Sequence, residues 1–118
     1  MNKYLLTTVC DKGYALGAQV MIYSISKNLK NFDQCDIKVY YNDNIAPLSE
    51  KNKNIFRAIG KNIILEHVDE TKYIDAKVPY HQGREEGSKA AYLTLESFNE
   101  TNYDKVIMFD VDMLCIKD

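Results

Sequence analysis

Two aspartates separated by one residue are the clearest candidates for chemistry in this chain. Asp110 and Asp112 flank Val111 and follow the apolar run at residues 106–109. Aspartate is disfavoured in strands and costly to bury unpaired, so this placement needs a cause. Residues at i and i+2 can present their oxygens toward one point, and oxygen ligands without histidine or cysteine suit Mg²⁺ or Mn²⁺. The pattern predicts a divalent metal site; the competing interpretation is a turn in which the aspartates cap backbone amides.

A second candidate is the loop at residues 10–14, which follows the first apolar run of the chain. In an open parallel α/β sheet, ligands bind beyond the carboxyl ends of the strands. The loop and the D-x-D tripeptide each follow a predicted strand. If both strands are parallel, we expect the loop and the two carboxylates to face one cleft, despite their separation in sequence.

The elements that must position these residues alternate between strand and helix. Apolar and β-branched runs predict strands over residues 4–9, 36–41, 62–68 and 105–109. The fourth of these is expected to be fully buried, and residues 113–116 to form a further short strand. Three- and four-residue spacing predicts a helix over 15–28. Pro47 and Ser49 are expected to open a second helix that contains Leu48, with Gly60 as its stop signal. The predicted fold is α/β, a Rossmann-like, mostly parallel sheet with helices on both faces, in a single subdomain spanning residues 1–118.

The region between the third and fourth strands is harder to assign. Residues 69–87 predict a long loop with a helical turn, and such loops are often functional. Ser88 is a candidate cap for a third helix, which is expected to turn Tyr92, Leu95 and Phe98 inward.

Composition excludes several classes of function. The formal net charge is −2 with no basic stripe, which argues against nucleic-acid binding. No apolar run is long enough to span a bilayer, and the N-terminus is too polar and short for a signal peptide. The three cysteines lack C-x-x-C spacing, so neither a disulfide framework nor a structural zinc site is expected. These features predict a cytoplasmic location and leave a homo-oligomer open.

Three ordered segments resemble one family. Asp110-Val111-Asp112 looks like the D-x-D motif of the GT-A nucleotide-sugar glycosyltransferases. Residues 6–8, followed by Asp11 and residues 14–18, resemble the opening of glycosyltransferase family 8, the group of glycogenin and the bacterial lipopolysaccharide galactosyltransferases. Residues 87–93 are similar to the helix start that precedes D-x-D in that family. The order and rough spacing agree across nearly the whole chain.

The resemblance implies a retaining transferase that moves a hexose from a UDP-sugar to a hydroxyl of a carbohydrate or protein acceptor, with Mn²⁺ or Mg²⁺ as cofactor. It implies that the metal ligands are Asp110 and Asp112, and that the nucleotide-sugar contacts are Thr8, Cys10, Asp11, Tyr14, Lys89, Asp110 and Val111. Alternatives stay open for two of these: an ordinary surface residue for Tyr14, and a solvated first-turn lysine for Lys89. Ordinary surface roles are favoured for His81, Arg84 and Glu85.

The chain also departs from the family pattern. The family's complete metal site adds a histidine downstream of D-x-D, and this chain ends at Asp118, just past the motif. No catalytic residue is therefore assigned, and the sequence is expected to be the donor-binding half of an enzyme with little activity of its own. One alternative is a non-catalytic remnant that binds a nucleotide sugar or a partner. Another is a haloacid-dehalogenase-like phosphatase, although Met113 and Leu114 stand where that class has glycine and threonine.

Overall fold

Strand β1 (Tyr4–Val9) lies inside the sheet because its residues are almost all buried, as its apolar and β-branched composition predicts. The computed structural model describes residues 3–73, 75 and 89–118. Its sheet has four strands in the order β3-β2-β1-β4, with β2 at Cys35–Tyr41, β3 at Ile63–His67 and β4 at Lys105–Met108. All the pairings are parallel. The predicted Rossmann-like sheet is confirmed.

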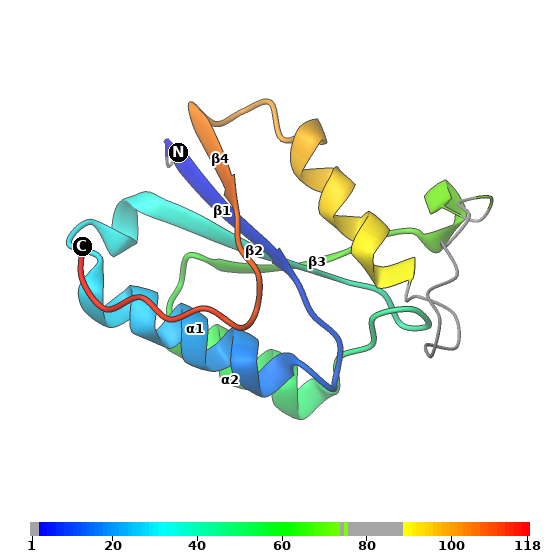
Figure 1. Ribbon diagram of the computed structural model, residues 1–118, viewed down its shortest axis with the longest axis horizontal. Helices are drawn as coiled ribbons and strands as arrows, with labels where there is room; N and C mark the ends of the chain where they lie inside the picture. Colours follow the sequence, from blue (N-terminus) through cyan, green and yellow to red (C-terminus); the bar gives the residue numbers. More distant parts are fainter. Residues whose placement is uncertain (1–2, 74, 76–88) are drawn as a thin grey trace.

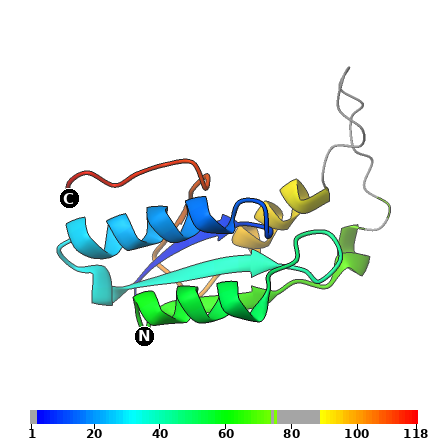
Figure 2. The same cartoon turned by 90° about the horizontal axis from the view of Figure 1, so that it is seen from below.

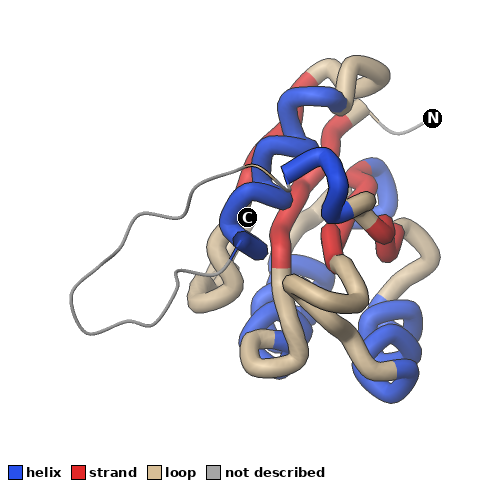
Figure 3. Tube along the Cα trace, turned by 90° about the vertical axis from the view of Figure 1, so that its right-hand side faces the viewer, coloured by secondary structure: helices blue, strands red, loops and turns tan. Residues whose placement is uncertain are grey.

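Helices cover both faces of this sheet (Figures 1 and 3). Helices α1 (Ala15–Asn28) and α2 (Glu50–Ile59) lie side by side on one face. The 3₁₀ helix η3 (Lys89–Asn99) lies on the other, while η1 (Phe32–Gln34) and η2 (Glu70–Tyr73) are short turns. Ser49 begins α2 as predicted, because its hydroxyl accepts a hydrogen bond from the amide of Asn52 at 3.1 Å. Among the described residues, no helix is long and apolar enough to cross a membrane.

The main core lies between the sheet and the two α-helices. Apolar side chains at three- and four-residue spacing on α1 meet alternate residues of β1 and β2, as in Ala18, Ile22 and Val39, each fully buried. Phe56 is the buried residue of α2 and fills the same core. The predicted helix at 15–28 and the strand at 4–9 are confirmed to the residue, since their periodic patterns are long and unbroken.

Helix η3 buries a different side from the predicted one. Leu95 and Phe98, expected to face inward, are 45% and 73% exposed, while Leu93, Glu96 and Ser97 are buried. Ser97 shares a 2.7 Å hydrogen bond with Thr7 of β1, and Glu96 accepts one from the Tyr73 hydroxyl at 2.7 Å. The side of the helix that meets the sheet therefore carries the fully buried Leu93 together with these polar residues. The proposed cap Ser88 lies outside the described residues.

Strand β4 is an edge strand and is not fully buried, contrary to prediction. Of the described strands only β1 pairs with it, and Ile107 and Met108 are 45% and 52% exposed. The residues expected to form another strand, 113–116, instead run as an extended segment along α1 (Figure 2). There the amide of Cys115 donates to the Ser24 hydroxyl at 2.9 Å. An apolar run specifies neither how many neighbours a strand has nor which element it packs against.

Two half-buried phenols should make the fold sensitive to alkali. Tyr73 and Tyr103 donate hydrogen bonds to Glu96 and Asp36. Burial first, and then these carboxylates, raises the pKa of each phenol from 10.0 to about 12. At a pH between the unfolded pKa of 10.0 and the folded pKa of about 12, the unfolded chain binds fewer protons than the folded chain. The contribution of these phenols to the free energy of unfolding is therefore fully present below about pH 10 and is lost as the pH rises toward 12.

We therefore expect the urea midpoint of unfolding to fall between pH 9 and pH 11, and Tyr103→Phe to reduce that fall. The exposed Tyr23 is the control, because Tyr23→Phe should leave the pH dependence unchanged. Equal midpoints for the unmodified chain at the two pH values would contradict this assignment.

Candidate functional site

The two candidate segments lie at the same edge of the sheet. β1 and β4 are adjacent and parallel, with Thr7 opposite Met108. The chain therefore leaves both strands at the carboxyl edge, where residues 10–14 and 110–112 follow. Figure 1 shows the turn after β4 passing beside the start of α1. The pairing confirms that these distant segments share one edge of the sheet, and that they face one cleft stays a prediction.

The D-x-D segment presents its carboxylates to solvent and its central side chain to the protein. Phe109 and Val111 are half-buried and pack against the main core, whereas Asp110 and Asp112 are exposed. Neither carboxylate has a hydrogen bond or salt bridge to another residue that the structure describes. The described backbone thus makes no use of these aspartates as caps, which was the competing interpretation.

Contacts from β1 and α1 hold the backbone of this segment. The amide of Phe109 donates to the carbonyl of Thr7 at 2.9 Å, and the hydroxyl of Thr8 donates to the carbonyl of Phe109 at 2.9 Å. A Cβ at Gly17 would stand 3.0 Å from the carbonyl oxygen of Val111. The structural role of Gly17 was not predicted, although a glycine inside an otherwise regular helix was a signal for it.

The first loop is ordered by the side chain that the resemblance assigns to base recognition. Asp11 Oδ1 accepts hydrogen bonds from the amides of Gly13 at 2.8 Å and Tyr14 at 3.2 Å. This arrangement is an Asx turn that leads into α1. Tyr14 is 63% exposed, so its ring is open to a planar ligand. The geometry gives Asp11 a structural task and leaves Tyr14 available for binding.

The thiol of Cys10 is not available for chemistry, so this residue could contact a ligand only through its backbone. Its side chain is 2% exposed. Burial, and secondarily the nearby charge of Asp11, raises the pKa of the thiol to about 12. The thiol is therefore neutral at physiological pH and suits neither nucleophilic attack nor metal ligation.

The candidate residues at positions 81–89 have no described side-chain positions. Lys89 begins η3, and its side chain lies outside the described residues. His81, Arg84 and Glu85 also lie outside them. The carboxyl edge is therefore characterised by the first loop and the D-x-D segment.

The chemistry of the donor set fits a hard divalent cation. Asp110 and Asp112 offer exposed carboxylate oxygens, while the described residues contain no cluster of three or more histidine, cysteine or acidic side chains. Mg²⁺ and similar ions commonly take one or two carboxylates from the protein and complete their shell with water and substrate phosphates. Two carboxylates beside a ligand-accessible loop match that mode of binding.

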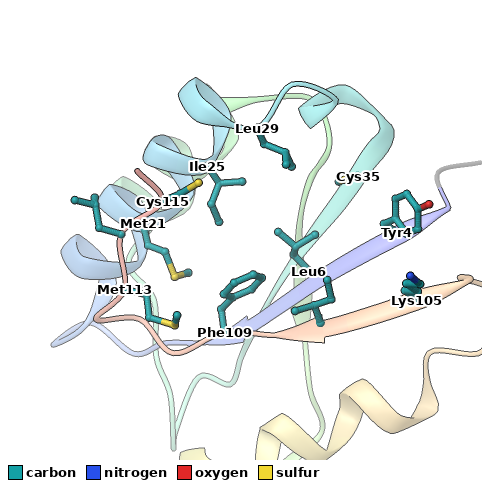
Figure 4. Close-up of a pocket in the computed structure, with 12 residues that line it drawn as sticks. Tyr4, Leu6, Met21, Ile25, Leu29, Cys35, Lys105, Phe109, Met113 and Cys115 are labelled. Carbon is teal, nitrogen blue, oxygen red and sulfur yellow. The ribbon is translucent and has the colours of Figure 1, made fainter. Parts of the chain in front are cut away.

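A separate cavity lies beneath this edge and has a different character. It occupies about 400 Å³ between α1, β1, β4 and the C-terminal segment, and Figure 4 shows Leu6, Met21, Ile25 and Phe109 around it. Its lining is almost entirely apolar, with the Lys105 ammonium and the Tyr4 hydroxyl at one end. Without carboxylates in its wall, this cavity does not match a metal–diphosphate site.

Sequence comparison agrees with this geometry. The model of the family described as Glycosyl transferase family 8 matches residues 5–118, a range that includes the first loop and both aspartates. A search of curated proteins finds no match. The chain belongs to glycosyl transferase family 8, a family of glycosyltransferases, and this membership implies a nucleotide-sugar donor and an acceptor.

Proposed function

We propose that this chain binds a UDP-sugar together with Mn²⁺ or Mg²⁺ at the carboxyl edge of β1 and β4, as the donor site of a retaining hexosyltransferase. One observation supports the proposal above all: the parallel pairing of β1 with β4 brings exposed Asp110 and Asp112 to the edge that carries the loop at 10–14. Family membership supplies the reaction class.

In this proposal Asp110 and Asp112 hold the metal. The ion would neutralise the diphosphate and stabilise it as a leaving group. The residues of the chain have the task of placing two carboxylates at a solvent-accessible edge and keeping them there. Their exposure permits this without the cost of burying unpaired charge.

The first loop would hold the nucleoside. The Tyr14 ring provides an exposed face on which a base can stack. The Asp11 turn fixes the backbone around Gly13, so the amides and carbonyls of the loop are ordered before the ligand arrives. The side chains of Thr8 and Cys10 are buried, so these two residues would meet the nucleotide through their backbone groups.

The transfer itself breaks the bond between the anomeric carbon and the diphosphate oxygen. A bond to the acceptor hydroxyl oxygen forms on the same face, and the hydroxyl proton passes to the leaving diphosphate or to water. No described residue is assigned as the base or nucleophile for this step. The proposal for this chain therefore concerns donor binding, and turnover is a separate measurement.

Isothermal titration calorimetry of the chain with UDP, with and without Mn²⁺, tests the proposal. We expect binding that requires Mn²⁺ and is lost when EDTA is added, since the carboxylates alone would repel a diphosphate. ADP under the same conditions is the control for base recognition by the loop. Equal binding of UDP with Mn²⁺ and with EDTA would contradict the metal-dependent site.

Release of UDP from a UDP-hexose, with and without added acceptor sugars, measures turnover. Binding without release supports a donor-binding unit, which was the non-catalytic alternative. Release that depends on the acceptor supports a complete transferase.

A further inference from the structure

The D-x-D segment lies just beyond the part of the sheet that could hold it. β4 ends at Met108, and one further ladder bond joins the Phe109 amide to the Thr7 carbonyl. From Asp110 onward, strand pairing no longer fixes the backbone. Two exposed carboxylates on an unpaired segment are better placed to share a metal when other elements orient the peptides next to them.

Thr8 orients the first of these peptides. Its side chain is 4% exposed, and its hydroxyl donates to the Phe109 carbonyl at 2.9 Å. The Phe109 carbonyl and the Asp110 amide belong to one planar peptide unit. Fixing that carbonyl therefore limits the rotation of the peptide that leads into Asp110.

Gly17 limits the position of the next carbonyl. A Cβ at this residue would lie 3.0 Å from the Val111 oxygen, closer than ordinary van der Waals contact. A methyl group here would therefore press on the centre of the D-x-D segment, and the Val111 carbonyl would have to move by a few tenths of an ångström to admit it. Glycine is kept here at a cost, because glycine inside a helix is less stable than alanine.

We infer that Thr8 and Gly17 are positioning residues for the metal-binding carboxylates of the D-x-D segment. Thr8 acts on the peptide before Asp110, and Gly17 acts on the carbonyl between Asp110 and Asp112. Neither side chain needs to touch metal or donor. This inference rests on the proposed function, in which Asp110 and Asp112 bind the metal.

The Mn²⁺ affinity of the chain at saturating UDP, read from the electron paramagnetic resonance signal of free Mn²⁺, tests the role of Thr8. We expect Thr8→Val to weaken Mn²⁺ binding roughly 10-fold, the lower end of the effect of outer-shell partners. Thr8→Ser keeps the donor hydroxyl and should restore most of the affinity. The matched control is Thr7→Val, which breaks a buried hydroxyl pair with Ser97 at 2.7 Å on the other face of the sheet.

Gly17→Ala separates positioning from stability. We expect the melting temperature of the free chain to stay the same or rise, because alanine favours the helix. We expect Mn²⁺ binding to weaken roughly 10-fold, because the new methyl group displaces the Val111 carbonyl. Ser26→Ala, a change toward alanine near the other end of α1, is the control and should leave Mn²⁺ binding unchanged.

The outcomes distinguish this inference from the proposed function. If Asp110→Asn removes Mn²⁺ binding while Thr8→Val and Gly17→Ala retain the affinity of the unmodified chain, the positioning roles are wrong and the metal site stands. If Asp110→Asn binds Mn²⁺ as the unmodified chain does, the metal site is wrong, and the inference fails with it. Loss of affinity in Thr8→Val and Gly17→Ala, recovery in Thr8→Ser and unchanged binding in both controls would support the inference.

Discussion

Replacing Asp110 by Asn is expected to abolish the thermal stabilisation that UDP and Mn²⁺ confer on this chain. Asn keeps the shape of the side chain but removes a charged oxygen ligand, which a hard cation needs. A ligand present at 100 times its dissociation constant stabilises the folded state by about 2.7 kcal/mol. For a domain of this size that corresponds to a shift of roughly 10 °C in Tm, which thermal unfolding followed by circular dichroism would resolve.

The free Asp110→Asn chain should unfold at the same temperature as the unmodified chain. Asp110 is exposed, and changes at such positions usually alter stability by less than about 0.5 kcal/mol. Asp104→Asn is the matched control, because this exposed aspartate directly precedes β4 and lies at the opposite end of the strand. A ligand-induced shift that persists in Asp110→Asn, or disappears in Asp104→Asn, would argue against the assigned metal site.

The largest effect on stability is expected from Phe56→Ala. Phe56 is fully buried and is the member of α2 that lies within the main core, against which Ile59 also packs. Truncating a buried phenylalanine typically costs about 3–5 kcal/mol, from lost burial and from the cavity that remains. Because domains are stable by only about 5–15 kcal/mol, this change should bring the chain close to unfolding. Urea denaturation would report it as a lower midpoint with an unchanged slope.

Ile55 provides a control from the adjacent position. It is 39% exposed, so Ile55→Ala removes apolar atoms from the same helix without opening a full core cavity. We expect its cost to be about 1 kcal/mol, well below that of Phe56→Ala. Similar costs for the two variants would mean that α2 does not pack through Phe56.

Most of the first half of the fold could be predicted from local pattern. The helix at 15–28 and the strand at 4–9 agree with α1 and β1 because each has a regular period and unambiguous flanking residues. For the second helix, Ser49 and Gly60 are the observed caps, whereas Pro47 and Leu48, which were expected at its start, lie before it. Strands β2 and β3 differ from the predicted ranges by one residue at an end or at both.

The predictions failed where the partner of an element, rather than its own pattern, decided its environment. An apolar sequence predicted a buried β4, but only one described strand pairs with it. Apolar spacing selected Leu95 and Phe98 for the inner side of η3. The buried side instead carries Ser97, which shares a hydrogen bond with Thr7, and Glu96, which accepts one from Tyr73. Hydropathy carries no information about which distant polar group is available as a partner.

The sequence by itself determined the residue types at the site and the order of strands and helices that carries them. Asp110 and Asp112 were identifiable because charged residues directly follow an apolar strand. Only the tertiary structure decided that Thr8 holds the peptide before Asp110 and that Gly17 leaves room for Val111. The Thr8 hydroxyl and the Phe109 carbonyl are 101 residues apart in sequence. Such a contact follows from the pairing of β1 with β4, which brings the two strand ends together, and not from any periodicity within either strand.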